Sequence, residues 1–207
     1  MSQLFSIHPE NPQIRLINQV VDIIQRGGVV VYPTDSGYAL GCQLGEKNAV
    51  DQIRRIKKVD DKHHLTLVCR DLSELSRYAK VDNVAYRLIK SHTPGPYTFI
   101  LKATSEVPRR LLHAKRKTIG LRVPDNRIAQ DMLGSLNEPI MSSTLILPGE
   151  DMPMTDPYEI RDLLGNQVDA VIDGGFCGME ETTIVDFTGD APEVVREGAG
   201  IADWQQD

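Results

Sequence analysis

Apolar residues recur along this chain with two periods, one typical of helices and one typical of buried strands. Three-to-four spacing predicts a first amphipathic helix through Ile14, Ile17, Val21 and Ile24. We expect it to begin at Asn11-Pro12, a capping side chain followed by proline, and to end at Gly27-Gly28. The β-branched run that follows, 29–32, predicts a buried strand, which we expect Pro33 to stop.

Helical and strand patterns alternate along the rest of the chain. Further helices are predicted at 47–57, 71–75, 84–90, 107–114, 128–136 and 157–164, and strands at 65–69, 97–101, 119–123, 140–142, 168–172, 183–187 and 193–196. Asp71 and Asp156 are the expected caps of two of these helices, and Glu74 has the capping-box position relative to Asp71. The strand-rich stretches near 97–123 and at the C-terminus indicate antiparallel pairs. The pattern predicts an α/β fold, a single-domain mixed and twisted sheet flanked by helices.

Length and composition narrow the class of protein. The 207 residues suit one large domain, although two small ones remain open, and 41% apolar residues are enough for a core without metal or disulfides. The three cysteines, Cys42, Cys69 and Cys177, are odd in number and form no C-x-x-C pair, which argues against a disulfide framework or a zinc site. No signal-peptide start and no apolar run of roughly 18 residues is present, so we expect a cytoplasmic protein without a membrane partner.

Charge is unevenly distributed in this acidic chain. The net charge of −6 argues against a generally basic nucleic-acid binder, yet the islands 54–58 and 109–117 hold nine of the 23 Lys and Arg residues. A solvated helix face explains either island alone. Together they also fit a locally positive site for a polyanionic ligand.

Familiar catalytic motifs are missing from the sequence. It has no G-x-x-x-x-G-K-[ST] loop, no Rossmann fingerprint and no G-x-S-x-G elbow. No histidine pair has the i, i+4 spacing of a helical metal site, since His63 and His64 are adjacent. We therefore predict no catalytic nucleophile and no dedicated metal ligand.

Hydroxyl and arginine side chains instead gather where predicted strands end. They are Thr34 and Ser36 after the first strand, Arg122 in an apolar strand, Ser142 to Thr144, Thr182 and Thr183, and Arg196. Each has a structural explanation: Thr34 closes a turn, Arg122 pairs with a carboxylate such as Asp186, or the serines cap a helix. As a set, they suit the oxygens of a carboxylate and a phosphate.

Several ordered motifs resemble the YrdC family of threonylcarbamoyl-adenylate synthases. Tyr32 to Gly41 is similar to the family's P-T-D-T-x-Y-G-L, and the later matches are Pro94 to Thr98 with P-G-P-x-T, Leu121 to Pro124 with V-R-x-P, Thr182 to Asp186 with S-T-[VI]-[VI]-D, and Arg196 to Ala199 with R-x-G-A. They extend from 28 to 200 and look most like the YciO branch, single-domain bacterial relatives of the synthases.

The resemblance implies a YrdC-like twisted sheet around a concave, positively charged groove. It also implies a reaction in which the amine of L-threonine and bicarbonate give a carbamate. The carbamate then attacks the α-phosphate of ATP and releases pyrophosphate. The product feeds the threonylcarbamoyladenosine modification of tRNA. Mg²⁺ would be held largely by phosphates and water.

The resemblance also assigns residues to the two substrates. Those that would face threonine are Thr34, His63, Arg122, Ser142 and Thr182, with Ser142 beside both substrates. Those that would face ATP are Lys57, Thr118, Thr144 and Arg196. Their hydroxyls and cations agree with the chemistry inferred from the residues themselves.

Two departures from the family pattern fall on the ATP side. Lys57 matches the lysine of a K-x-R motif, but Val59 replaces its arginine, and the S-A-N-x-S-G stretch has Ile146 for the asparagine and Pro148 for the second serine. Charge-assisted bonds lost this way are worth roughly 1.5–3 kcal/mol each. We therefore predict a weak synthase or one with a changed substrate.

Two other functions stay open. A non-catalytic protein could bind double-stranded RNA or tRNA in the same groove, with the basic islands supplying phosphate contacts. A carbamoyl transfer like that of the related domain in hydrogenase maturation proteins is disfavoured, because their zinc-finger and acylphosphatase parts are missing.

Overall fold

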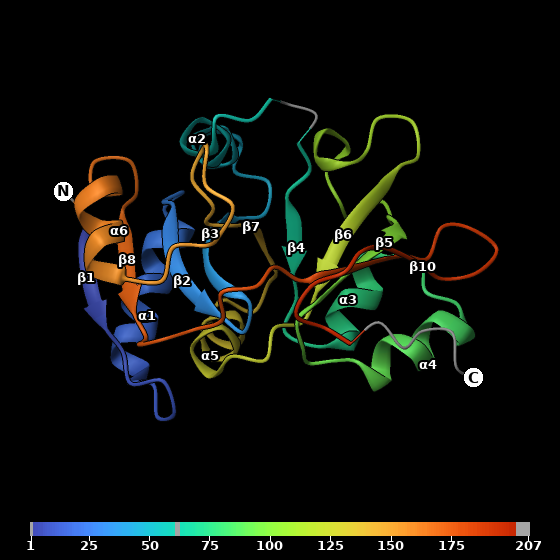
Figure 1. Cartoon of the computed structure of the whole chain (residues 1–207), viewed down its shortest axis with the longest axis horizontal. Coiled ribbons are helices and arrows are strands. Elements are labelled where there is room, and N and C mark those ends of the chain that lie inside the picture. Colours follow the sequence, from blue (N-terminus) through green and yellow to red (C-terminus); the bar gives the residue numbers. More distant parts are fainter. Residues whose placement is uncertain (1, 61–62, 202–207) are drawn as a thin grey trace.

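The ten strands of the computed structural model, which describes residues 2–60 and 63–201, join one mixed sheet (Figure 1). Its order is β1-β8-β2-β3-β7-β4-β6-β5-β9-β10. The strands are β1 (Gln3–Ser6), β2 (Val30–Thr34), β3 (Gly37–Gln43), β4 (Thr66–Val68), β5 (Tyr97–Lys102), β6 (Thr118–Arg122), β7 (Ile140–Thr144), β8 (Ala170–Asp173), β9 (Thr183–Asp186) and β10 (Glu193–Arg196).

Parallel and antiparallel pairs alternate irregularly across this sheet. The β1–β8, β2–β8, β4–β6 and β5–β9 pairs are parallel. The β2–β3, β3–β7, β4–β7, β5–β6 and β9–β10 pairs are antiparallel. The predicted mixed sheet is confirmed, including antiparallel pairs within 97–123 and near the C-terminus.

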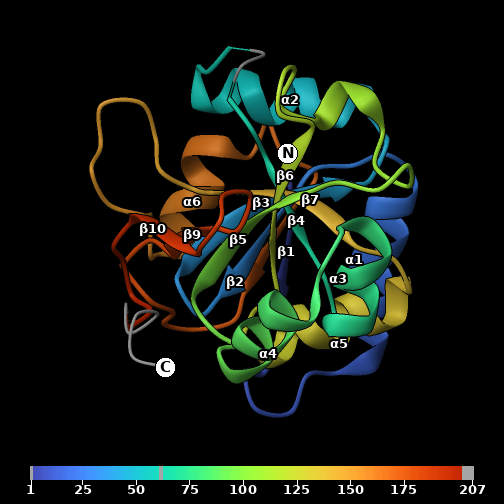
Figure 2. The same ribbon diagram turned by 90° about the vertical axis from the view of Figure 1, so that its right-hand side faces the viewer.

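Six α-helices and one short 3₁₀ turn accompany the sheet in the described residues. They are α1 (Ile14–Gln25), α2 (Lys47–Lys57), α3 (Leu72–Tyr78), α4 (Asn83–Ser91), α5 (Arg127–Leu136), α6 (Pro157–Leu164) and η1 (Arg109–Leu111). In Figures 1 and 2, α2 lies at the top of the molecule, and α3, α4 and α5 lie at the bottom. None of these helices has the length and hydropathy needed to cross a membrane.

Strand β2 is buried on both faces because two separate cores flank it. Val31 belongs to the core that α2, α3, α4 and α6 share, whereas Val30 and Tyr32 belong to the core under α1 and α5. Alternate residues of a strand point to opposite faces, so an uninterrupted apolar run is what such a strand requires. This part of the sequence prediction is confirmed.

Two local predictions are wrong. Helix α1 begins at Ile14 with Gln13 as an N-cap that makes no side-chain bond, so the Asn11-Pro12 pair lies outside the helix. Strand β2 continues through Pro33, which lies opposite Tyr38 of β3, while pairing with β8 ends at Val31. Successive residues of an antiparallel strand direct their N–H groups to opposite sides. Because pairing with β8 has already ended at Val31, the absence of an N–H group at Pro33 costs no hydrogen bond to β8.

Two strands and one helix also differ from the predictions. The sequence analysis missed β1 and β3, and the expected helix at 107–114 is only the single turn η1. The two predicted helix caps are confirmed. Asp71 accepts a hydrogen bond from Glu74 N at 2.9 Å, and Asp156 accepts one from Tyr158 N at 2.8 Å. The Glu74 carboxylate accepts from Arg70 N, one residue before the cap, so the capping box is displaced.

Candidate functional site

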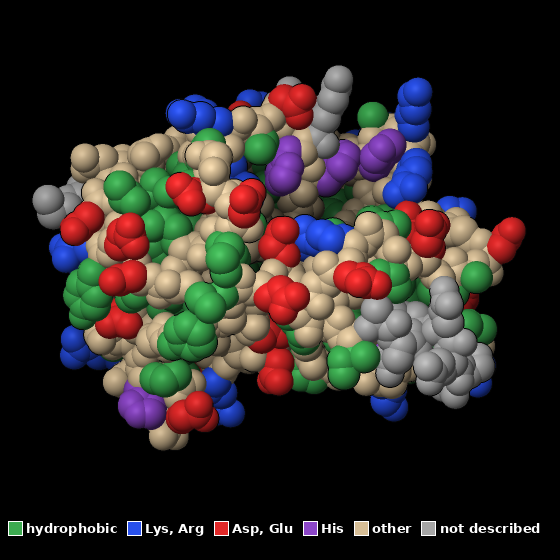
Figure 3. Space-filling view, in the orientation of Figure 1, with side chains coloured by type: hydrophobic (Ala, Val, Ile, Leu, Met, Phe, Trp, Pro, Cys, Tyr) green, Lys and Arg blue, Asp and Glu red, His purple; other side chains and the backbone are tan. Residues whose placement is uncertain are grey.

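A cavity of about 170 Å³ collects most of the predicted site residues on one face of the sheet. Seven of the nine predicted residues line it: Lys57, His63, Arg122, Ser142, Thr144, Thr182 and Arg196. In Figure 3, His side chains lie above a hollow in the middle of this face of the molecule, and Lys or Arg side chains lie below it next to Asp or Glu side chains.

The sheet register brings these polar residues together. Thr66 of β4 lies opposite both Ser142 of β7 and Gly120 of β6. The next residues along these strands, such as Leu67 and Met141, face the other side of the sheet and belong to the core that α2, α3, α4 and α6 share. The hydroxyls therefore occupy one sheet face, within strands as well as at their ends.

Arg122 is the most deeply buried cation of the cavity, with 6% of its surface exposed. Its Nη2 donates to the carboxylate of Asp35, and its Nη1 donates to Ser36 Oγ at 2.9 Å. Its Nε is buried and has no hydrogen-bond partner within the described residues. Asp186, the partner considered from sequence, pairs instead with Arg116 at 3.0 Å.

Arg196 is held at the other side of the cavity by its own chain. Its Nη1 donates to the Glu181 carboxylate at 2.8 Å, and its Nη2 donates to the backbone oxygen of Thr182 at 2.8 Å. The hydroxyl of Thr182 bonds that of Thr98 at 2.9 Å. The carboxylate of Glu181 therefore occupies the position at which a ligand anion would bind Arg196.

The hydroxyl proton of Ser142 is already used in a hydrogen bond. Its hydroxyl donates to the backbone oxygen of Leu40 at 2.9 Å, so the 2.7 Å contact with Tyr32 has the phenol as donor. Burial raises the pKa of Tyr32 to about 12, which keeps that donor protonated at neutral pH. Towards the cavity, Ser142 can therefore accept a hydrogen bond but has none to donate.

Two further ionisable groups face the cavity. Lys57 Nζ donates to the backbone oxygen of Thr144 at 2.6 Å, and burial lowers the pKa of this lysine. The pKa of His63 is lowered by burial first and then by the charge of Lys57. His63 is thus a neutral imidazole at pH 7, able to accept a proton.

Thr34 and Thr118 do not line this cavity. Thr34 is buried and donates to the backbone oxygen of Gly37 at 2.6 Å, closing the β2–β3 turn, and its hydroxyl contacts Ser36 at 3.2 Å. Thr118 lines an adjacent cavity of about 160 Å³ that shares His64 and Thr66 with the first. The substrate roles of all nine residues stay predictions.

The site also contains polar side chains to which the sequence analysis gave no substrate role. Asp35 and Ser36 orient Arg122, Thr98 contacts Thr182, and Glu181 holds Arg196. Ser36 was among the hydroxyls noted at strand ends, and Thr98 ends the Pro94–Thr98 motif. For Asp35 and Glu181 the sequence signal was their position beside Thr34 and Thr182.

Charge in the cavity is mixed, and its donors do not form a metal cage. Three cations and the carboxylate of Glu181 line it, and the concave, positively charged groove stays a prediction. Among the described residues, no three His, Cys, Asp or Glu side chains are grouped to hold a metal ion. Mg²⁺ does not fit a protein-held position in this set of donors.

The departures from the family pattern lie outside the cavity lining. Val59 lines a separate cleft beside α2, and Pro148 is exposed. Ile146 is half-buried, with its backbone N–H donating to the oxygen of Thr144. Their effect on a ligand would act from the edge of the site.

Comparison with known proteins gives consistent matches over nearly the whole chain. The Sua5_yciO_yrdC family model, described as "Telomere recombination", matches residues 22–198. The YciO protein of Escherichia coli K12 is 62% identical over 200 residues, and a Haemophilus influenzae protein is 63% identical over 201, each match covering 97% of both chains.

Two solved structures are also similar. The crystal structure of E. coli YciO has a TM-score of 0.95 at 60% identity and covers 98% of each chain. The crystal structure of P. abyssi Sua5 complexed with L-threonine has a TM-score of 0.87 at 26% identity. That match covers 95% of this chain and 58% of the Sua5 chain.

Proposed function

Because the chain belongs to the Sua5/YciO/YrdC family, we propose that its cavity binds L-threonine and ATP and forms a threonylcarbamoyl adenylate with bicarbonate. The proposed activity is weak or directed to a related amino acid, because Val59, Ile146 and Pro148 replace family residues on the ATP side. The product would serve the modification of a tRNA adenosine.

The observation that carries this proposal is the buried Arg122 at a cavity lined by hydroxyls and further cations. A buried guanidinium beside hydroxyl groups suits a ligand carboxylate, which it can bind through charge-assisted hydrogen bonds. The cavity holds about 170 Å³ and its neighbour about 160 Å³, so that together they reach the lower end of the range for small-molecule sites, which begins at roughly 300 Å³. The threonine complex of P. abyssi Sua5 supports the choice of amino acid.

Each residue has a role that follows from its bonds. Arg122 and Thr182 would hold the amino-acid carboxylate and hydroxyl, and Ser142 would accept a hydrogen bond from the amine. His63, neutral at pH 7, would take the proton that the ammonium must lose before it attacks bicarbonate. The resulting N–C bond forms with loss of water.

Adenylate formation then needs charge stabilisation rather than a protein nucleophile. A carbamate oxygen bonds the α-phosphorus, and the bond to the departing pyrophosphate breaks. Lys57 and Arg196 would neutralise the phosphate charge, with Arg196 exchanging Glu181 for a phosphate oxygen. Mg²⁺ would enter with the nucleotide and supply further charge neutralisation on its phosphates.

The test is formation of pyrophosphate and a carbamoyl-AMP from ATP, bicarbonate and threonine, detected by mass spectrometry. We expect slow turnover that Lys57→Gln abolishes, and an increase of about tenfold or more in Val59→Arg, from a bond worth roughly 1.5–3 kcal/mol. Serine and other small amino acids would show whether the substrate has changed. Absence of turnover above background with every amino acid, in Val59→Arg as well, would overturn the proposal.

A further inference from the structure

Two loop segments, 148–156 after β7 and 174–181 after β8, meet at the start of β3. A Cβ atom built on Gly37 would lie 2.9 Å from Pro153 Cβ and 3.1 Å from the backbone oxygen of Gly178. Both segments therefore lie against the same glycine and form one continuous surface.

Three large apolar side chains point outwards from this surface. Phe176 is 78% exposed, Met152 is 55% exposed and Met179 is 46% exposed. The backbone before Phe176 is held in place, because the hydroxyl of Tyr38 donates to the backbone oxygen of Gly175 at 2.8 Å. We name Met152, Phe176 and Met179 the Phe176 patch.

The Phe176 patch is large enough to form the centre of a small interface. At roughly 200 Å² for a large apolar side chain, its exposed fractions amount to about 350 Å², which is typical of the largest and often functional patch on a monomer. A stable dimer buries about 800 Å² on each partner, so the patch suits a transient complex better. Two of the three residues are methionines, whose flexible side chains adapt to the surface of a partner.

Carboxylates surround the Phe176 patch. The two segments contain no Lys or Arg, and their five acidic residues are Glu150, Asp151, Asp156, Glu180 and Glu181. The same segments, orange in Figure 1, face the viewer in Figure 3, where hydrophobic side chains in the left half of the molecule have Asp and Glu side chains on both sides. This acidic rim repels nucleic acids and anionic membranes, and it attracts cations.

We propose that the Phe176 patch is the docking site of a basic protein partner, one that presents Lys or Arg side chains around an apolar or aromatic group. The apolar group would pack between Phe176 and the two methionines, and the cations would pair with the acidic rim. Buried apolar anchors carry most of the affinity of an interface, whereas charges at the rim mainly add specificity and salt dependence.

The docking site borders the cavity of the proposed synthase and does not use its substrate-binding residues. None of the three residues of the Phe176 patch lines the cavity. Gly178 packs so closely on the backbone oxygen of Asp35 that a Cβ atom would not fit between them, and Asp35 holds Arg122. A bound partner would thus lie beside the cavity, and the docking proposal does not depend on the synthase proposal.

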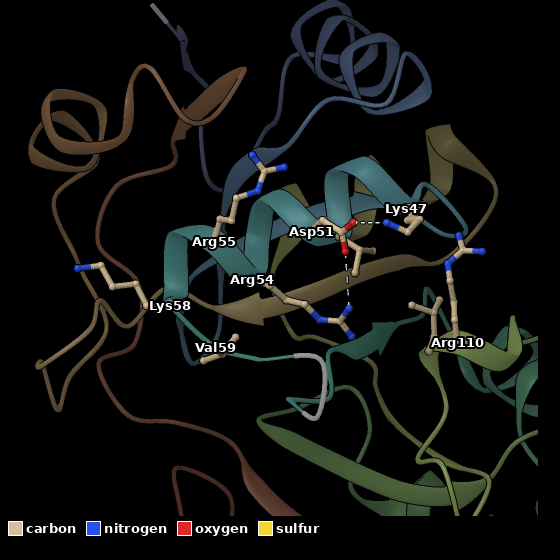
Figure 4. Close-up of a pocket in the computed structure, with 9 residues that line it drawn as sticks. Lys47, Asp51, Arg54, Arg55, Lys58, Val59 and Arg110 are labelled. Carbon is tan, nitrogen blue, oxygen red and sulfur yellow. Dashed lines mark hydrogen bonds and ion pairs between the residues drawn. The ribbon is translucent and has the colours of Figure 1, made fainter.

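A second copy of this chain fits the Phe176 patch less well. Two facing patches would bring their acidic rims together, and like charges across an interface lower the affinity. A second copy could instead offer cations from the cleft beside α2, where Arg55 and Lys58 point away from the helix (Figure 4). Such a head-to-tail contact is heterologous and would give rings or open chains, so sedimentation velocity distinguishes it from a monomer.

The experiment is a phage-display selection of random peptides of about 15 residues, roughly four helical turns, against the wild-type protein. The charge of the enriched peptides is then a result of the selection. Their affinity is measured by fluorescence anisotropy for wild type and for Phe176→Ser with Met179→Ser. The matched control is Val84→Ser with Tyr86→Ser, which removes two exposed apolar side chains from α4. Urea unfolding checks the fold of both variants.

We expect the enriched peptides to combine a net positive charge with aromatic or large apolar residues. Their affinity should fall about tenfold or more in Phe176→Ser/Met179→Ser, as expected for an apolar anchor, and stay unchanged in the α4 control. Glu150→Gln with Glu180→Gln should weaken binding about threefold at about 50 mM salt. That difference should disappear at about 500 mM salt, where the Debye length is only about 4 Å.

Four results would overturn the proposal. The first is that no peptide is enriched, or that the enriched peptides carry no net positive charge. The second is that these peptides bind Phe176→Ser/Met179→Ser as tightly as wild type. The third is an equal loss of affinity in the α4 control. The fourth is self-association in sedimentation velocity that Phe176→Ser/Met179→Ser abolishes, which would make a second copy the occupant of the patch.

Discussion

Neutralising Asp35 tests whether the Arg122–Asp35 pair holds the site together. Replacement by asparagine keeps the shape of the side chain and removes the charge opposite the guanidinium. The two side chains are only 7% and 12% exposed, so Arg122 would be left as a buried cation with little solvent to compensate it. Breaking such a buried pair from one side costs about 3–5 kcal/mol, and Asp35→Asn should lie near the lower figure because the amide oxygen can still accept a hydrogen bond.

Urea unfolding followed by circular dichroism measures this cost. At a slope of about 3 kcal/mol per molar urea, the midpoint should fall by about 1 M. The matched control is Asp131→Asn, which disrupts the Arg127–Asp131 pair, where the side chains are 65% and 29% exposed. That change should cost less than about 1 kcal/mol.

A double variant sharpens the test. Asp35→Asn with Arg122→Met removes both charges, and it should recover most of the stability lost in Asp35→Asn, because the isolated buried cation is gone. Two results would contradict this account of Arg122 as a buried cation neutralised by Asp35. One is that Asp35→Asn unfolds at the same urea concentration as Asp131→Asn, and the other is that the double variant is less stable than Asp35→Asn.

Two predictions concern the ionisable groups around the cavity. The pKa of His63 is lowered by burial and by Lys57, so the unfolded chain takes up this proton at a higher pH than the folded one, and stability should fall as the pH drops below ~6.5. His63→Gln should flatten that pH dependence. NMR titration should show the pKa of His63 rising when ATP binds, and an unchanged pKa would place ATP elsewhere. Glu181→Gln frees Arg196 from a half-exposed ion pair worth about 0.2–1 kcal/mol, so ATP should bind up to about fivefold more tightly by calorimetry, and weaker binding would contradict the competition between Glu181 and phosphate.

The sequence was informative where local chemistry decides the structure. The run at 29–32 has no polar position, so it predicts a strand buried on both faces, which β2 is. Asp71 and Asp156 precede helical patterns and cap helices as expected. Helix α2 begins and ends where its apolar spacing and basic last turn indicate.

Tertiary contacts decide the features that the sequence analysis missed. Strand β3 contains Gly37 and Gly41, which weaken a strand pattern, and it is fixed by pairing with β2 and β7. Asp35 and Asp186 are equally good partners for Arg122 in the sequence, and only the packed turn after β2 selects Asp35. The role of Glu181 depends on the β9–β10 pairing that brings Arg196 beside it.

Isothermal titration calorimetry with threonine and ATP, separately and together, tests most directly whether the cavity is a joint amino-acid and nucleotide site. The account predicts that threonine binds the wild-type protein, that ATP and threonine each bind more tightly in the presence of the other or together with bicarbonate, and that Arg196→Gln weakens ATP while Thr182→Val weakens threonine. Failure of both ligands to bind at millimolar concentration, or binding that neither substitution changes, would contradict it.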